Sequence, residues 1–325
     1  MTYQYLYNQE NLESICKDRP LITSERHEVN DFYGQAYVLK RYCGLSEYKS
    51  LKLVYEHSLK LHSEIWEEDL KAPFNTAFTS SRSRYKCFKK TNKFKFVFPI
   101  GPPLLYAKDI VEQRLKKKDL DISCERRGTI VFPSHSTHHI SAEFDTLSFI
   151  NSLLKFSEEF KPITICIYWK DYLQGKHLLY EQYGFKVISA GHIFDKYFLL
   201  RFYDICRQFK YSYANNIGSD LFYSSLCGCQ YFCDYNIKIE HKNPNKFELH
   251  FDNSELLKNK NIAQKLFKFP SELTSEKVDF IETIAGTGYK RDKKTLLFLI
   301  LSAEFIWKMR GIKARGKKYL YNLLK

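Results

Sequence analysis

Residues 185–234, FKVISAGHIFDKYFLLRFYDICRQFKYSYANNIGSDLFYSSLCGCQYFCD, form the stretch that decides the fold. An apolar run ends at Gly191-His192, and a helix-like segment then leads to the strand-like residues 211–214. The polar turn 215–220 precedes a second helix-like segment and a last apolar run. This strand–loop–helix alternation predicts a parallel sheet. Ligands bind at the loops that follow such strands, and loops this small and polar favour a phosphate or a nucleotide.

Composition bounds the class of protein. The chain has 325 residues, of which 44% are hydrophobic and 16% aromatic, so we expect a packed globular protein with room for two domains. Its net charge of +14 favours an anionic partner, such as a nucleic acid, a membrane face or a charged substrate.

The cysteines and the N-terminal sequence predict a cytoplasmic protein. Nine cysteines lie at scattered spacings, and the first residues contain no apolar signal segment. The longest apolar run near the C-terminus, residues 296–301, is far shorter than the ~20 residues of a membrane span. We therefore expect no integral membrane segment.

Strand-like and helix-like segments alternate on both sides of a charged linker, KKKDLDISCERR, at residues 116–127. We predict an α/β fold with an N-terminal domain over 1–118, a C-terminal domain over 119–290 and a basic helix and tail over 291–325. The predicted strands are 51–55, 75–79, 94–100, 129–132, 163–169, 186–190 and 211–214, with a short one after the second helix-like segment. Helices are predicted over 64–70, 80–90, 143–159, 173–183, 275–285 and 293–310.

A loop rich in histidine and hydroxyl groups follows the predicted strand 129–132. It contains His135, Ser136, Thr137 and His138. These side chains and the backbone N–H groups of such a loop donate to phosphate oxygens, so a substrate loop is the first interpretation. A helix N-terminus capped by Ser and Thr is the second. A metal site is the third, but no Cys or carboxylate stands beside the histidines at a zinc-like spacing.

Two further loops follow consecutive strands of the same predicted sheet. One contains Gly191 and His192, and the other contains Asn215, Asn216, Gly218, Ser219 and Asp220. Such residues bind a ribose or place helix N–H groups against a phosphate. The alternative for the second loop is an ordinary turn in which Ser219 or Asp220 caps the next helix.

Two residues in the first part of the chain are candidates for proton transfer or substrate positioning. Asp31 is a candidate general base, with a helix N-cap at Asn30 or Asp31 as the alternative. His57 follows the predicted strand 51–55, where an imidazole hydrogen-bonds a charged substrate or is simply a satisfied polar residue.

Two motifs that suggest a metal have simpler explanations. Cys227-Gly228-Cys229 with Cys233 lacks a fourth ligand, so we interpret these thiols as packing groups. The pair Asp119 and Asp121 lies in the charged linker and is interpreted as solvated surface. We therefore predict no metal site and no bound cofactor.

The C-terminal segment alternates basic and apolar residues. Lys308, Arg310 and the basic residues after them are interleaved with Trp307, Ile312 and further aromatic and aliphatic side chains. This composition suits an anionic membrane surface or a solvated helix end. A nucleic-acid partner is less favoured because no known RNA-binding module is present.

Taken in order, these segments resemble bacterial surface-polysaccharide glycosyltransferases of the GT-B type, which act in capsule or lipopolysaccharide assembly. The similar segments are 31–34, 56–58, 100–106, 132–138, 191–192, 216–219 with 222–223, and 280–286. Ser58 departs from the pattern, since these enzymes more often carry Gly after the His.

The resemblance implies two Rossmann-like domains facing each other across a cleft, with an inverting, metal-independent transfer from a nucleotide-sugar co-substrate to a glycan or lipid-linked acceptor. It implies Asp31 as the preferred base and His57 as the alternative or a positioning residue. The donor would lie among the 135–138, 192 and 215–220 residues, and the acceptor near Gly101 and Tyr106. A peripheral position at the inner membrane is implied as well. A non-catalytic nucleotide- or nucleic-acid-binding protein and a polyol-phosphate transferase remain the alternatives.

Overall fold

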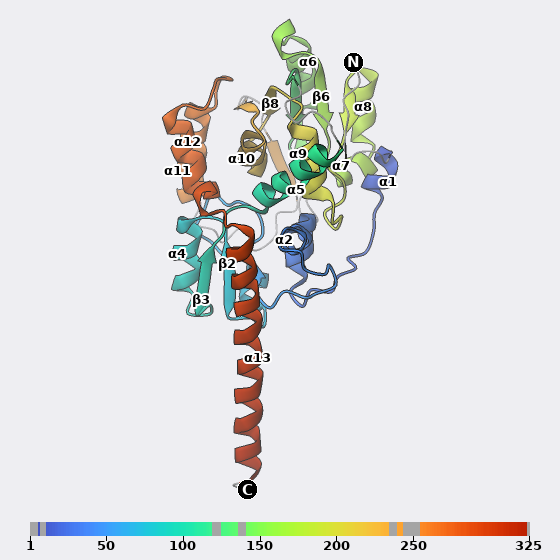
Figure 1. Cartoon of the computed structure of the whole chain (residues 1–325). Helices are drawn as coiled ribbons and strands as arrows, with labels where there is room; N and C mark the ends of the chain where they lie inside the picture. Colours follow the sequence, from blue (N-terminus) through green and yellow to red (C-terminus); the bar gives the residue numbers. More distant parts are fainter. Residues whose placement is uncertain are drawn as a thin grey trace.

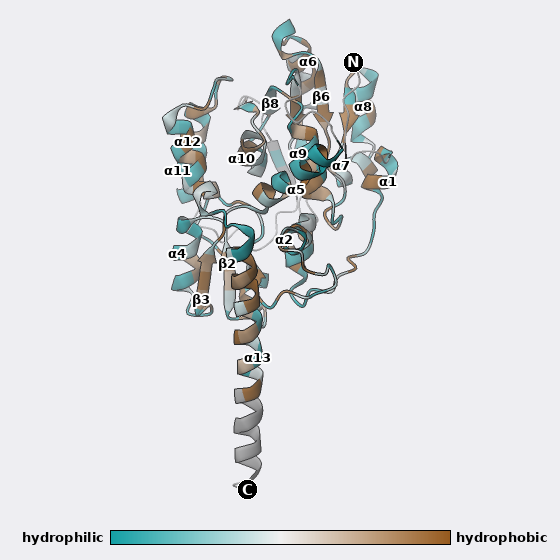
Figure 2. Ribbon diagram, viewed as in Figure 1, coloured by the Kyte–Doolittle hydropathy of each residue, from teal (hydrophilic) through white to brown (hydrophobic). Residues whose placement is uncertain are grey.

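A computed structural model describes residues 11–118, 125–135, 141–233, 239–242 and 254–323, together with Leu6. Its frame consists of two all-parallel sheets surrounded by helices (Figure 1). The predicted α/β class is thereby confirmed. The hydrophobic residues are concentrated in strands such as β3 and β6, whereas the outer helices α4 and α8 are largely hydrophilic (Figure 2).

The smaller sheet has three strands in the order β1 (Val54–Tyr55), β2 (Thr76–Thr79) and β3 (Phe96–Pro99). The central strand β2 is buried along its whole length, which explains its unbroken run of small and apolar residues. Helix α4 (Arg82–Lys90) follows β2 directly because the Ser81 side chain caps it by accepting from the Arg84 N–H.

The larger sheet has five strands in the order β7-β6-β4-β8-β9. The predicted strands of the C-terminal half are all present in it, although most are shorter than predicted. In chain order they are β4 (Thr129–Phe132), β6 (Ile163–Cys166), β7 (Lys186–Ile188), β8 (Tyr211–Ala214) and β9 (Gln230–Cys233).

The order of these strands reverses between β4 and β8. From β4 the chain moves outward through β6 to β7, then returns to place β8 and β9 on the other side of β4. Numbered along the chain, this is the 3-2-1-4-5 order of a Rossmann-like sheet, whose ligands bind where the order reverses. A ligand-binding site is therefore expected at the loops after β4 and β8.

Three helices connect the two sheets. They are α2 (Gln35–Cys43), α5 (Pro103–Lys117) and α9 (Phe198–Cys206), and α5 packs against both of the others. One continuous apolar cluster runs through this layer, from Phe78 of the smaller sheet to Ile130 of the larger one. The α5 helix was not predicted, although the Pro at its first position is a known helix-start signal.

The predicted helix over 143–159 is wrong at both ends. Residues Ser141–Phe144 form strand β5, which pairs antiparallel with β10 (Ile239–Lys242). Helix α6 (Thr146–Leu154) begins only after Asp145, whose carboxylate accepts from the Ser148 N–H at 3.0 Å. The cap fixes the start of the helix because it satisfies a backbone N–H that has no partner within the helix.

The last helix, α13 (Lys293–Leu323), is longer than the predicted 293–310. The prediction ended it before Gly311, but a single glycine costs only about 1 kcal/mol inside a helix and the flanking residues are good helix formers. The other helices are α1 (Leu12–Cys16), α3 (Glu67–Lys71), α7 (Trp169–Leu173), α8 (Lys176–Gln182), α10 (Ser219–Leu226), α11 (Ser254–Leu266) and α12 (Ser275–Ala285), with short 3₁₀ turns at Glu28–Gly34, Glu158–Phe160 and Thr287–Tyr289.

Candidate functional site

A cavity of about 230 Å³ lies where the strand order of the larger sheet reverses. The loops that follow four of its parallel strands form most of the wall, and residues from the first part of the chain close it. The wall residues used below are Tyr33, Gln35, Ser58, Ser134, His135, Tyr168, Ser189, Gly191, Asn216, Gly218, Ser219, Asp220 and Tyr223.

The two central loops of the cavity are joined directly. The backbone N–H of Ser134, after β4, donates to Oδ1 of Asn215, after β8, over 2.7 Å. Asn215 is only 2% exposed, and its Nδ2 has no hydrogen-bond partner in the described part of the chain. The side chain predicted to bind a ligand therefore holds the two loops together, and both N–H donors of its amide group stay unused among the described residues.

Three polar atoms of the cavity wall itself also have no hydrogen-bond partner among the described residues. They are Oε1 of Gln35, Oγ of Ser134 and Oδ2 of Asp220. A buried polar atom without a partner is uncommon in native proteins and calls for an explanation, of which an absent ligand is one. Because the three atoms belong to three separate segments that meet at one cavity, a polar ligand accounts for all of them together.

Asp220 stands in the first turn of α10, next to the cavity. Burial raises the pKa of its carboxyl from the usual 3.8 to about 7. A carboxyl with this pKa changes charge near neutral pH, which is the property of many catalytic acids and bases. Gly218 leaves room for this carboxyl, because a Cβ on that residue would lie 2.5 Å from Oδ1 of Asp220.

The N-terminus of α10 is not capped by a side chain. Gly218 is the N-cap residue, so neither Ser219 nor Asp220 fills the capping role that sequence reasoning offered as the alternative. The first N–H groups of a helix attract anions when no side chain satisfies them. No Lys or Arg is present among the described wall residues, so an anionic ligand here would depend on these N–H groups and on hydroxyl groups.

Two wall residues have backbone conformations that favour glycine. Tyr33 has φ +56° and Ser58 has φ +66°. Such strain in a non-glycine residue is costly and is found disproportionately at functional sites. The Tyr33 backbone is held by a 2.6 Å hydrogen bond from its N–H to the Ile193 carbonyl. The segment that carries Tyr33 is thus fixed against the loop that follows β7 of the larger sheet.

His57, a predicted catalytic or positioning residue, lies one layer behind the wall. Its ring stacks on Tyr33 at 5.5 Å and also contacts Phe32 and Trp66. Burial lowers the pKa of the imidazole to about 3, so it is neutral at physiological pH. An imidazole with so low a pKa is a weak base, and its contacts fit a role in positioning Tyr33.

Asp31, predicted as the general base, is not among the wall residues that the structure describes. Its carboxylate accepts a hydrogen bond from the Thr23 hydroxyl. The neighbouring Asn30 clamps the segment to the smaller sheet, donating to the Leu53 carbonyl at 2.9 Å and accepting from the Tyr55 N–H at 2.8 Å. Neither residue is the N-cap of the 3₁₀ turn Glu28–Gly34, which is His27.

The predicted donor-binding histidines have different positions. His135 is exposed at the cavity and stacks on Tyr168, with ring centroids 4.4 Å apart. His192 is fully buried, where Nδ1 accepts from the Phe194 N–H at 3.1 Å and the ring packs against Trp169. Gly191 rather than His192 forms the wall at this point. Ser136, Thr137 and His138 lie outside the described residues.

The predicted acceptor-side residues hold a turn together. The Tyr106 hydroxyl donates to the Ile100 carbonyl at 2.5 Å and accepts from the Arg291 N–H at 3.0 Å. Gly101 has φ +73°, and a Cβ there would lie 3.1 Å from the Lys290 nitrogen. Both residues are buried and contribute nothing to the described cavity wall.

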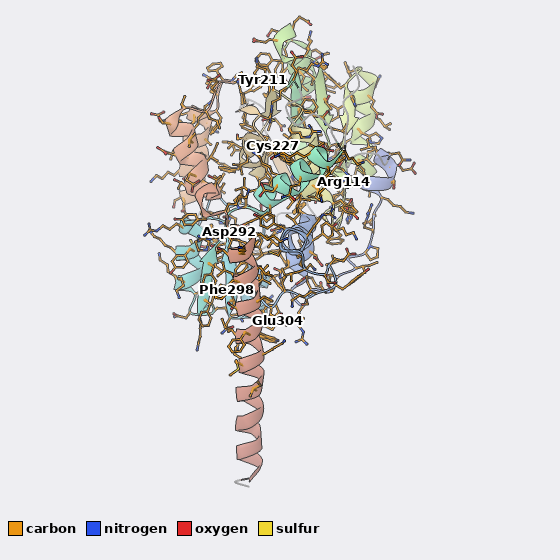
Figure 3. The ribbon with its side chains drawn as sticks, viewed as in Figure 1. Arg114, Tyr211, Cys227, Asp292, Phe298 and Glu304 are labelled. Carbon is orange, nitrogen blue, oxygen red and sulfur yellow. The ribbon has the colours of Figure 1, made fainter. Side chains whose placement is uncertain are left out.

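The described residues include no group of three or more His, Cys, Asp or Glu side chains with the geometry to hold a metal ion. Asp119 and Asp121 lie outside this part of the chain. Cys227, Cys229 and Cys233 are buried free thiols, and burial raises the pKa of Cys229 above its usual range (Figure 3 labels Cys227). They pack as small apolar groups, as expected from the sequence.

Sequence reasoning missed Gln35 and Tyr168. Tyr168 follows β6, so the rule that ligands meet the carboxyl ends of parallel strands was sufficient to find it. Gln35 is the first residue of α2 and carries no sequence signal, because only the packing of the first part of the chain against the larger sheet brings it to the cavity.

The fold and the site together define an α/β protein with a Rossmann-like parallel sheet and a cavity at its switch point. No protein-family model matches the chain, and no curated protein matches it. None of the described helices combines the length and the hydrophobicity that crossing a membrane requires.

Proposed function

We propose that the protein is a glycosyltransferase that moves a sugar from a nucleotide-sugar donor to a glycan or lipid-linked acceptor of a bacterial surface polysaccharide. The observation that carries the proposal is the cavity at the switch point, where Gln35, Ser134 and Asp220 present polar atoms without partners among the described residues. In this proposal the two sheets belong to two Rossmann-like domains of the GT-B arrangement. The larger sheet binds the donor, and the first part of the chain binds the acceptor.

The donor's phosphate groups would meet the uncapped N-terminus of α10, with the Ser219 hydroxyl beside it. Such a site neutralises phosphate charge with backbone dipoles and needs no basic side chain. Ser134 and Asn216 offer hydroxyl and amide groups for a ribose. Phe202 and Tyr223 of the same wall contact each other and provide an apolar surface for a base or a sugar ring.

The transfer step would be a single displacement. The acceptor hydroxyl oxygen forms a bond to the anomeric carbon as the bond from that carbon to the phosphate oxygen breaks, so the nucleotide leaves with the electron pair. A carboxylate takes the hydroxyl proton. The configuration at the anomeric carbon is inverted, and uncapped N–H groups stabilise the charge on the leaving phosphate.

Two carboxylates compete for the proton. Asp31 is the base that the sequence resemblance implies, but its side chain accepts from Thr23 outside the cavity wall. Asp220 lies in the wall, and its pKa of about 7 matches proton transfer near neutral pH. We assign the proton transfer to Asp220 and a positioning role to His57, which supports Tyr33.

A donor screen tests the proposal without knowledge of the acceptor. The full chain is incubated with nucleotide-activated sugars, including CMP-linked ulosonic acids, with and without EDTA, and nucleotide release is measured with a bacterial glycolipid extract as acceptor. We expect release from one donor class, dependent on the extract, unaffected by EDTA and reduced at least a hundredfold by Asp220→Asn. Asp31→Asn serves as the matched carboxylate control.

Three results would redirect the assignment. Release without dependence on any glycan or lipid acceptor would contradict transfer. Movement of a polyol phosphate in place of a sugar would identify the same cavity as that of a phosphotransferase. Tight, salt-sensitive RNA binding together with no release from any donor would support a non-catalytic nucleic-acid-binding protein, consistent with the net charge of +14.

A further inference from the structure

The C-terminal helix α13 packs against the body only along its first half. Leu296, Ile300 and Ala303 are buried on that side. Glu304 pairs with Lys49 at 2.6 Å, and the Trp307 ring meets Phe74 at a centroid distance of 5.0 Å. Beyond these contacts the helix projects away from the rest of the molecule (Figure 1).

The opposite side of α13 carries an apolar stripe exposed to solvent. Hydrophobic residues recur along the coloured upper part of the helix (Figure 2), and one of them, Phe298, is labelled in Figure 3. On a helix that turns about 100° per residue, the five stripe residues fall within an arc of about 80°, facing away from Ile300. The stripe consists of Phe298 (68% exposed), Leu301 (44%), Phe305 (64%), Met309 (48%) and Ile312 (57%).

This arrangement distinguishes the stripe from scattered surface residues. Single exposed apolar side chains are ordinary, but a contiguous row of them on a projecting element marks a contact surface. Two aromatic rings and three aliphatic side chains, all between 44% and 68% exposed, lie in contact with water along four helical turns. We therefore expect another molecule or surface, the occupant of the stripe, to cover these side chains.

The charge of the segment identifies that occupant. Residues 305–325 contain seven Lys or Arg and no Asp or Glu. Lys308 is exposed at one edge of the stripe, whereas Arg310 is exposed on the side of the helix that faces the body, where its guanidinium contacts the Trp307 ring. Two copies of this helix would bring like charges together, which opposes a coiled-coil dimer. A nucleic acid would satisfy the charge but would leave the apolar stripe in water.

We propose that α13 is an interfacial helix that docks the protein on an anionic lipid surface. The stripe enters the boundary between headgroups and acyl chains, and the ammonium group of Lys308 at its edge contacts the lipid phosphates. Since Leu296, Ile300 and Ala303 face the body from the other side of the helix, the globular part is held above the membrane plane. The helix lies on the bilayer and does not cross it. This inference is independent of the transferase proposal, because binding to lipid is measured without any donor.

Vesicle flotation with the full chain tests the proposal. One set of vesicles is pure phosphatidylcholine, and the other contains one third phosphatidylglycerol. We expect binding to the second set and little to the first, with a steep loss at high salt. Lys308→Gln is expected to weaken binding by about fivefold.

The stripe has a matched control elsewhere on the surface. Phe305→Ser with Ile312→Ser removes two stripe residues, and we expect at least tenfold weaker binding to the anionic vesicles. Phe269→Ser with Leu178→Ser removes one aromatic and one aliphatic side chain of similar exposure, 69% and 61%, away from α13. This control pair is expected to bind as tightly as the wild-type protein. Circular dichroism checks that all variants are folded.

Each other outcome overturns the proposal. Absence of binding to anionic vesicles contradicts it directly. Binding that the stripe variant leaves unchanged means that α13 is not the contact. A concentration-dependent dimer that the stripe variant dissolves, seen by light scattering without lipid binding, makes a second copy the occupant. RNA binding that persists in the stripe variant, again without lipid binding, assigns the basic residues to a nucleic acid.

Discussion

Oδ1 of Asn215 accepts a 2.7 Å hydrogen bond from the backbone N–H of Ser134, and this contact joins the two loops at the switch point of the larger sheet. The residues are 81 positions apart in the chain. Because the loops belong to neighbouring strands β4 and β8, the bond fixes the opening of the cavity between them.

Replacing Asn215 tests how much the cavity depends on this bond. Asn215→Ala leaves the partly buried Ser134 N–H without its acceptor, which costs about 1 kcal/mol. We expect the midpoint of chemical denaturation to fall by a corresponding amount. Asn215→Asp retains the acceptor oxygen and is expected to recover stability relative to the Ala variant. Equal losses in both variants would show that the hydrogen bond itself is not the stabilising contact.

The Asp220 carboxyl is expected to make the free energy of unfolding decrease as the pH rises. Its carboxyl has a pKa of about 7 in the folded protein and about 4 in the unfolded chain, so the folded state retains the proton longer. Between about pH 4 and pH 7, stability therefore falls as the pH rises. Asp220→Asn should remove this component of the pH profile, as measured by thermal unfolding. If the stability of Asp220→Asn changed with pH as steeply as that of the wild type, the raised pKa of the Asp220 carboxyl would be contradicted.

The same group predicts the pH dependence of activity. If Asp220 takes the acceptor proton, the active form is the carboxylate, and kcat/KM rises through an inflection near pH 7. The residual activity of Asp220→Asn should lack that inflection, whereas Asp31→Asn should retain it. Loss of the inflection in Asp31→Asn alone would return the role of base to Asp31.

His57 contributes the opposite pH dependence to stability. Its imidazole titrates at about pH 3 when folded and near 6.5 when unfolded. The unfolded chain thus binds the proton first, and stability falls as the pH decreases below about 6.5. His57→Phe fits among the aromatic rings around it and should flatten this acid limb in thermal unfolding. His62, whose pKa is lowered to about 4, adds a parallel component that the variant leaves in place.

Ser58 carries backbone strain that a glycine would relieve. Its φ of +66° costs an L-residue about 1–2 kcal/mol relative to glycine. Part of that gain is lost because glycine makes the unfolded chain more flexible. We expect Ser58→Gly to raise the free energy of unfolding by about 0.5–1 kcal/mol. Asn92→Gly at φ +55° is the control and should gain less, because Asn tolerates this conformation. A destabilised Ser58→Gly would mean that the Ser side chain itself is needed there.

The strands of the larger sheet could be predicted from the sequence, whereas the residues around the cavity could be predicted only in part. Buried parallel strands such as β6 are short apolar runs between polar loops, so each strand and the loop after it can be located locally. Asn216 and Asp220 were found in this way, and they do line the cavity. Orientation was not predictable, which is why His192 was expected to face a ligand although it is buried against Trp169.

Contacts between distant parts of the chain account for the other errors. Gln35 reaches the cavity through the packing of the first part of the chain, and no local pattern reports that packing. Strand β5 depends on a partner about a hundred residues later, so its own residues read as an extension of the following helix. The resemblance placed Gly101 and Tyr106 on the acceptor side, and the structure shows them in a buried turn outside the described cavity wall.

The central claim is that the cavity at the switch point binds a nucleotide. It is tested most directly by thermal unfolding with CMP, CDP, UDP, GDP and dTDP, followed by calorimetric titration of the best ligand into the wild type and into Asn215→Ala, Asp220→Asn and Phe269→Ser. A bound ligand raises the unfolding temperature by mass action. We expect one nucleotide class to do so, with affinity reduced at least tenfold in Asn215→Ala. The affinity should be retained in Asp220→Asn, whose carboxyl is assigned to proton transfer, and in Phe269→Ser. Stabilisation by none of the nucleotides, or equal affinity in all four proteins, would contradict the claim.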